Sequence, residues 1–131
     1  MIPPPVLQAL VVADQIYTDA ATGKKIIAGV FNRLMASDFP ATFSTQTWAY
    51  ISVTNIHGPV EFVVRYVDLN DGKMLMEASP IRATCDDPLR SIEITLPVPP
   101  FPMPHEGSYA FEVYAGEERL GALRITVSRM E

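Results

Sequence analysis

The chain is poor in cysteine: Cys85 is the only one among 131 residues, so no disulfide can form within it. A nucleophilic role for this thiol would need a histidine and a third orienting group nearby, and nothing in the sequence ties either histidine to it. We interpret Cys85 as a small, partly buried apolar residue. The N-terminus also lacks the basic segment of a secretory signal, and no apolar run is long enough to span a bilayer. The expected location is the cytoplasm.

Phosphate-binding glycine loops and clusters of basic residues are absent as well. The seven glycines are scattered, and 15 acidic residues against 10 basic ones give a formal net charge of −5. This balance argues against binding to nucleic acid or to an anionic membrane surface. No spacing of histidine and cysteine typical of a metal site occurs, and no cofactor is predicted.

The composition that is present indicates a folded domain. Hydrophobic residues make up 48% of the chain and charged residues 19%, which is enough to fill a core. We expect residues 1–131 to form a single domain. The twelve prolines cluster at 3–5 and 97–104, where neither a helix nor a central strand can form. The second cluster predicts an extended crossover between two sheets.

The remaining sequence divides into short runs rich in Val, Ile, Thr and aromatic residues, with the spacing of a β-sandwich. These runs are 7–17, 24–31, 46–54, 60–69, 73–83, 91–96, 108–115 and 120–128. Propensity alone would also allow a helix over 7–16 and one helical turn over 32–37. We expect an all-β fold, a two-sheet antiparallel β-sandwich of about seven to nine strands with immunoglobulin-like or similar topology.

Two hairpins are the clearest elements. In the runs 108–115 and 120–128, apolar and polar residues alternate on both sides of a short turn, which is typical of strands with one dry face. The run 60–69 is followed by Asp71 and Gly72, a pair that tolerates the positive φ angles of a tight turn. We therefore predict hairpins over 60–83 and 108–128.

The order of several motifs along the chain carries a resemblance. These motifs are Ala13-Asp14 at the end of the first strand, the run 26–31, Phe39-Pro40, the turn 68–72, the proline-rich crossover and the closing strand 107–113. Together they resemble a family of uncharacterised bacterial β-sandwich domains, described only as a domain of unknown function. The closing Gly-x-Tyr-x-Phe strand is also similar to immunoglobulin-like and fibronectin-like modules. The resemblance implies a fold, and it implies no activity, cofactor or partner.

Polar loop residues offer few candidate sites. The turn 68–72 is similar to the start of a calcium loop, but an EF-hand needs a glutamate at the position where this chain has Ala78, so we interpret it as a turn. His57, His105 and Glu106 lie in two predicted loops. They could form a metal or catalytic site only if the two loops meet at one end of the sandwich. Otherwise both histidines are solvated loop residues.

Outward-facing apolar residues are the candidates for an interface. Tyr114 is predicted to point outward, and Leu75 and Met76 follow Met74 in an apolar triplet of which at least one side chain must face away from a single core. Trp48 and Tyr50 fall on one face of their strand, and we predict that they pack in the core. An exposed pair would instead form a stacking platform for a sugar or peptide.

These observations rank three functions. First is a non-enzymatic binding or assembly module that uses strand edges or outward apolar residues to contact a protein partner or a second copy in a homodimer. Second is a small-ligand or carbohydrate-binding module. Third is an enzyme with a loop-built site, ranked last because the sequence has no nucleophile–base or metal-ligand spacing.

Overall fold

The structure, a computed structural model, describes residues 3–78 and 80–130, which form twelve strands joined by turns and bends. In chain order they are β1 (Val6–Thr18), β2 (Lys25–Val30), β3 (Arg33–Ala36), β4 (Ala41–Phe43), β5 (Thr47–Thr54), β6 (Gly58–Asp68), β7 (Met74–Glu77), β8 (Ile81–Cys85), β9 (Ile92–Val98), β10 (Phe101–Met103), β11 (Gly107–Ala115) and β12 (Glu118–Arg129). Within these ranges no helix has the length and apolar character needed to cross a membrane.

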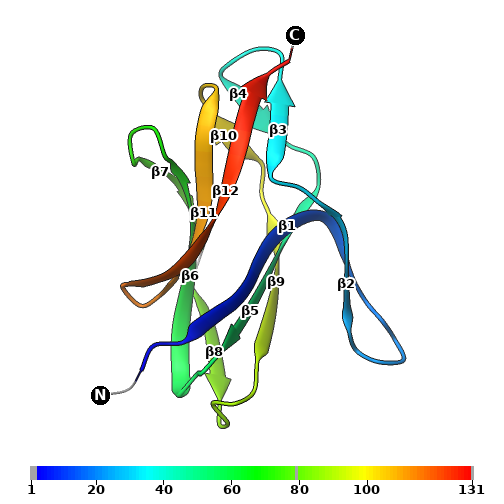
Figure 1. Cartoon of the computed structure of the whole chain (residues 1–131), viewed down its shortest axis with the longest axis vertical. Helices are drawn as coiled ribbons and strands as arrows, with labels where there is room; N and C mark the ends of the chain where they lie inside the picture. The colour runs from blue at the N-terminus through cyan, green and yellow to red at the C-terminus, as the bar shows by residue number, and fades with distance from the viewer. Residues whose placement is uncertain (1–2, 79, 131) are drawn as a thin grey trace.

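The strands form an all-β sandwich, as predicted (Figure 1). A four-stranded sheet has the order β2-β1-β5-β9, and a larger sheet has the order β3-β12-β11-β6-β7 with β8 also paired to β6. A small third sheet pairs β10 with β4. Every pair is antiparallel except β3 and β12, which run parallel. The core lies between the four-stranded and the six-stranded sheet.

The number of strands exceeds the prediction, for local reasons. The segment 32–37, for which a helical turn was considered, contains β3, because β12 offers it a free edge to pair with. The run 73–83 divides into β7 and β8, which pair with different halves of β6. The proline-rich segment contributes the end of β9 and all of β10. Pro97 is accommodated because β9 is an edge strand, where a missing N–H leaves no ladder bond unmade.

The other predictions for the strands are confirmed. Residues 7–16 belong to strand β1 rather than to a helix. The segment 108–128 forms the antiparallel hairpin of β11 and β12, and β6 pairs antiparallel with both β7 and β8. Alternation identified the hairpin of β11 and β12, and the Asp71-Gly72 turn identified the pairing of β6 with β7.

Aromatic residues from several strands fill the centre of the core. Tyr66 stacks on Tyr109 with ring centroids 5.6 Å apart, and its ring also lies 5.0 Å from those of Phe101 and Phe111. All four side chains are buried. Aromatic contacts at these distances contribute beyond the area they remove from water. They also join β10 to the six-stranded sheet.

A two-residue link ties the two sheets together at one edge. Phe31 and Asn32 join β2, the edge of the four-stranded sheet, to β3, the edge of the six-stranded sheet. The Phe31 amide donates to the carbonyl of Val12 at 3.2 Å, and the Asn32 carbonyl accepts from the amide of Thr126 at 2.9 Å. The link is thus hydrogen-bonded to both sheets.

Candidate ligand cleft between the two sheets

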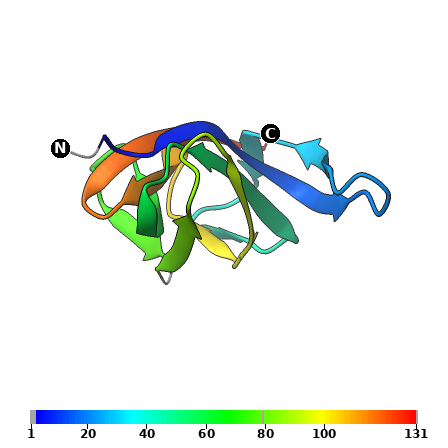
Figure 2. The same ribbon diagram turned by 90° about the horizontal axis from the view of Figure 1, so that it is seen from below.

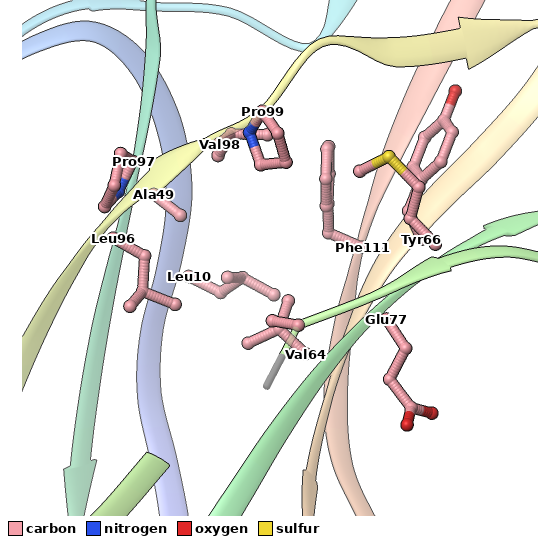
Figure 3. Close-up of a pocket in the computed structure, with 12 residues that line it drawn as sticks. Leu10, Ala49, Val64, Tyr66, Glu77, Leu96, Pro97, Val98, Pro99 and Phe111 are labelled. Atoms are coloured by element: carbon pink, nitrogen blue, oxygen red, sulfur yellow. The ribbon is translucent and has the colours of Figure 1, made fainter. Parts of the chain in front are cut away.

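An apolar cleft lies on the side of the sandwich formed by β7 and β9 (Figure 3). Its volume is about 320 Å³. The edge strands of the two sheets do not pair with each other there, so the space between the sheets is open to solvent. The lining residues are Leu10, Ala49, Val64, Tyr66, Met76, Glu77, Ala78, Leu96, Pro97, Val98, Pro99 and Phe111.

The alternation of the strands explains the apolar character of the cleft. Leu10 and Leu96 point inward from the four-stranded sheet, and Val64 faces them from β6 (Figure 3). On β5, the cross-strand neighbour of Leu96 is Ala49, which is buried and contributes only a methyl group to the cleft. The small side chain at this central position leaves the space that a larger residue would fill. Phe111 closes the cleft on the side of the six-stranded sheet.

The few polar groups of the cleft are already engaged. The Tyr66 hydroxyl donates to the Pro102 carbonyl at 2.9 Å, and burial raises the pKa of this phenol well above its ordinary value. Glu77 points its carboxylate away from the apolar side chains (Figure 3), where it accepts from Arg65 Nε at 2.8 Å. Among the described lining residues, no side-chain donor is therefore left to hydrogen-bond a ligand deep in the cleft.

The predicted interface residues lie on different sides of the six-stranded sheet. A register shift between β6 and β7 lets Leu75 and Met76 both pack against the core, and Met76 lines the cleft. Met74 is the member of the triplet that faces outward, with 49% of its surface exposed. Tyr114 lies on the outer face and is half-buried, because the Arg65 guanidinium covers its ring at 4.3 Å.

His57 and His105 do not meet. His57 precedes β6, and His105 contacts Asp68 at the other end of this strand of 11 residues, which spans about 35 Å. His57 Nε2 donates a 3.1 Å hydrogen bond to Asn55 Oδ1, and the side chain is exposed. Glu106 accepts from the amide of Arg129 at 3.0 Å. The described part of the chain contains no group of three or more His, Cys, Asp and Glu residues that could hold a metal ion.

His105 and Asp68 form a polar clamp at the β10–β11 turn. His105 Nε2 lies 2.6 Å from Asp68 Oδ2, and Nδ1 lies 2.8 Å from the Glu106 carbonyl. Because both ring nitrogens face acceptors, the imidazolium is favoured, and the Glu106 carbonyl followed by the Asp68 carboxylate raises the pKa of His105 above 6.5. Burial opposes ionisation of Asp68, but hydrogen bonds from Asn70 and His105 outweigh it and lower the pKa of Asp68 below 3.8.

The prediction that Trp48 and Tyr50 pack in the core is wrong. Ala49 and Ile51 take the inward positions of β5, so the two aromatic side chains lie half-buried on the outer face of the four-stranded sheet. Both phases of this strand are apolar, and alternation alone cannot decide between them. Trp48 Nε1 is buried and has no hydrogen-bond partner among the described residues.

Comparison with known proteins agrees with the resemblance seen in the sequence. Residues 8–128 match a family model described as a family of unknown function, DUF6941. The chain belongs to the DUF6941 family. A solved structure of an immunoglobulin-like protein from Pseudomonas aeruginosa is similar at 10% identity with a TM-score of 0.46, covering 96% of this chain and 98% of that one. The comparison with curated proteins gives no match.

The cleft of this DUF6941 protein was missed by sequence reasoning. Most of its residues come from β1, β5, β6, β7, β9 and β11, and the apolar residues of its walls are ordinary inward-facing residues in their own strands. The exposed rim residues Ala78 and Pro99 directly follow β7 and β9. Only two local signals are present in the sequence. The small side chain of Ala49 indicates space in the core, and Pro97 and Pro99 indicate an edge strand that cannot pair further along its length. Neither signal locates the opposite wall.

Proposed function

We propose that this protein is a non-enzymatic binding module that holds a small apolar ligand in the cleft between its two sheets. The observation that carries the proposal is the cavity of about 320 Å³ with its apolar lining. Ligand sites in proteins typically occupy about 300–1,000 Å³ and are lined mainly by hydrophobic and aromatic side chains. The cleft lies at the lower end of this range, which favours a short or slender molecule.

The lining argues against a carbohydrate. A sugar buried in the cleft would lose its hydrogen bonds to water, which costs about 1–3 kcal/mol for each group left unpaired. Tyr66 and Glu77, the side chains that could replace those bonds, are already paired with Pro102 and Arg65. An apolar chain has no such cost and gains about 0.8 kcal/mol for each buried methylene.

The rim argues against an extended peptide in the same place. A peptide that adds to a sheet edge needs backbone N–H and C=O groups to pair with. Pro97 and Pro99 form one side of the rim and have no N–H to offer. The cleft therefore suits a ligand that does not need a backbone ladder.

A fluorescence titration with the neutral apolar dye N-phenylnaphthylamine, followed by displacement with decanol, tests the proposal. Ala78 is exposed at the rim, so Ala78→Trp covers the mouth without disturbing the core. We expect saturable binding to the native protein and a loss of about tenfold or more in Ala78→Trp. Ala122→Trp, an exposed position on β12, is the matched control and retains the native affinity.

A second variant is needed because the tryptophan introduced at position 78 could itself bind the dye. Ala49→Leu fills the floor of the cleft, and its folding is checked by circular dichroism. We expect it to lose dye binding while keeping the native spectrum. The proposal fails if the native protein shows no saturable binding, or if both cleft variants bind the dye as the native protein does.

A further inference from the structure

The hairpin of β1 and β2 projects from the side of the sandwich (Figures 1 and 2). Ala13 is the last residue of β1 that pairs with β5, opposite Trp48. Beyond it, residues 15–18 pair with β2 alone, so this part of the four-stranded sheet is a two-stranded ribbon. Two-stranded ribbons are marginally stable in water unless another element packs on them.

Apolar side chains predominate on the outward face of this ribbon, where Gln15 opposite Ala28 is the polar member. Tyr17 is 54% exposed and stands opposite Ile26, which is 51% exposed. Val30, at the other end of β2, is 59% exposed and stands opposite Ala13. The same face continues over the half-buried Trp48 of β5. Single exposed apolar residues are common on soluble proteins, but these side chains are neighbours on one face and form a continuous patch.

Strand β2 is also an edge with one side unpaired. Only β1 pairs with it, so the opposite backbone groups of Lys25–Val30 have no strand partner among the described residues. The other edges are less suited to pairing. Strand β9 carries Pro97, whereas β3 and β7 have four residues each and β8 has five.

We propose that a second copy of this chain pairs with β2, antiparallel and about a twofold axis at Ala28. This register places Ile26 of each copy opposite Val30 of the other, so that the two exposed side chains at each position cover one another. The contact is isologous, and it leaves no unpaired β2 edge from which further copies could add. Lys24 and Lys25 fall opposite Asn32 and Phe31 of the second copy, which separates the like charges.

Charge complementarity favours a second copy over another partner. Gly29 stands across from Asp14, and a Cβ at Gly29 would collide with the Asp14 carboxylate, which therefore lies over the glycine toward the free edge. In the proposed register, Lys25 of one copy and Asp14 of the other share a face, with Cα atoms about 12 Å apart across two strand spacings. A lysine and an aspartate side chain can bridge this separation. The twofold axis repeats the pair.

Sedimentation velocity over a concentration series on the full chain tests the proposal. We expect a reversible dimer that Val30→Asp converts to monomer, because the new carboxylate would face Ile26 of the second copy. Met74→Asp on β7 is the matched control, since Met74 is also about half exposed on an edge strand, and it leaves the dimer unchanged. Circular dichroism verifies that each variant is folded.

A charge exchange separates this register from other modes of association. Asp14→Lys and Lys25→Asp are each expected to weaken the dimer about tenfold, and the double exchange is expected to restore it. The proposal is overturned if the native chain stays monomeric at high micromolar concentration, if Val30→Asp leaves the dimer intact, or if the double exchange associates no better than the single variants. None of these results depends on the ligand cleft.

Discussion

The outer faces of the two sheets are built from different chemistry. On the six-stranded sheet, charged side chains pair with one another: Glu112 is buried to 8% exposure, lies 3.4 Å from Arg119 Nε and accepts from the Tyr114 hydroxyl at 3.1 Å. Arg65 bonds Glu77 and covers the Tyr114 ring. The polar groups of this face satisfy each other within the monomer.

The outer face of the four-stranded sheet is mainly apolar around β1 and β2. Ala13 is fully buried there between Trp48 and Val30, and Trp48 leaves its buried indole N–H without a partner among the described residues. The polar side chain Gln15 lies on this face of the hairpin and accepts from Gln46 Nε2 at 2.6 Å. The outer face of the six-stranded sheet, with its own ion pairs, is suited to contact with water. The apolar face around β1 and β2 instead gains free energy when another surface removes it from water.

A buried carboxylate on each face would test this contrast most strongly. Ala13→Asp places a charge where Val30 and Trp48 are the cross-strand neighbours, and we expect it to lower the free energy of unfolding by about 3–5 kcal/mol. Ala110→Asp buries the same group on the six-stranded sheet, but directly opposite Arg124, so its cost is expected to be smaller by about 1 kcal/mol. Urea unfolding measures both, and equal losses would contradict the contrast.

The dependence of stability on pH is the next largest effect, and it should arise at the end of the six-stranded sheet. The raised pKa of His105 adds stability that is complete below pH 6.5 and is lost as the pH rises through the folded-state pKa. The lowered pKa of Asp68 adds stability that is complete above pH 3.8 and is lost as the pH falls further. The clamp is therefore strongest between these two values.

Thermal unfolding of the native protein and of His105→Gln, measured at pH values from below to above 6.5, tests the effect of His105. The Tm difference between them is expected to shrink as the pH is raised above 6.5. His57→Gln is the control, since His57 lies at the far end of β6 and has no carboxylate partner among its described contacts. A Tm difference for His105→Gln that does not change with pH would refute the assignment of an imidazolium.

The smallest expected effect distinguishes a partnered polar atom from an unpartnered one. Tyr114→Phe removes a hydroxyl bonded to Glu112, and we expect it to cost about 1 kcal/mol. Trp48→Phe removes the indole N–H that has no described partner, and this gain offsets the lost packing area, so the net change is expected to be about zero. Urea midpoints compare the two, and a greater loss for Trp48→Phe would show that the indole N–H is paired in solution.

Much of the fold could be predicted because the relevant signals are local. The β11–β12 hairpin has alternating residues on both sides of a short turn, and the core positions Tyr109, Phe111 and Val113 follow from that alternation. The family resemblance rested on the same local motifs and is confirmed by the match over residues 8–128. The cleft could not be predicted in this way, because the distance between its walls depends on how two sheets pack.

Other errors have equally specific causes. The phase of β5 was ambiguous because Trp48 and Tyr50 compete with Ala49 and Ile51 for the core, and all four are apolar. Strand β3 depends on a parallel partner more than ninety positions later in the chain, which no local pattern reveals. The sequence could not decide whether the loops of His57 and His105 meet, since nothing in either loop indicates which end of the sandwich it occupies.

The link at Phe31 and Asn32 gives the sandwich a mechanical asymmetry. One edge of the sheet pair is fastened by the chain and by hydrogen bonds to both sheets, whereas the opposite edge, between β7 and β9, has no ladder to break. Separation of the sheets then resembles rotation about a hinge, with the smallest displacement at Phe31 and the largest at the mouth of the cleft. The ligand that we propose for the cleft would then enter by a small angular change that leaves every strand intact.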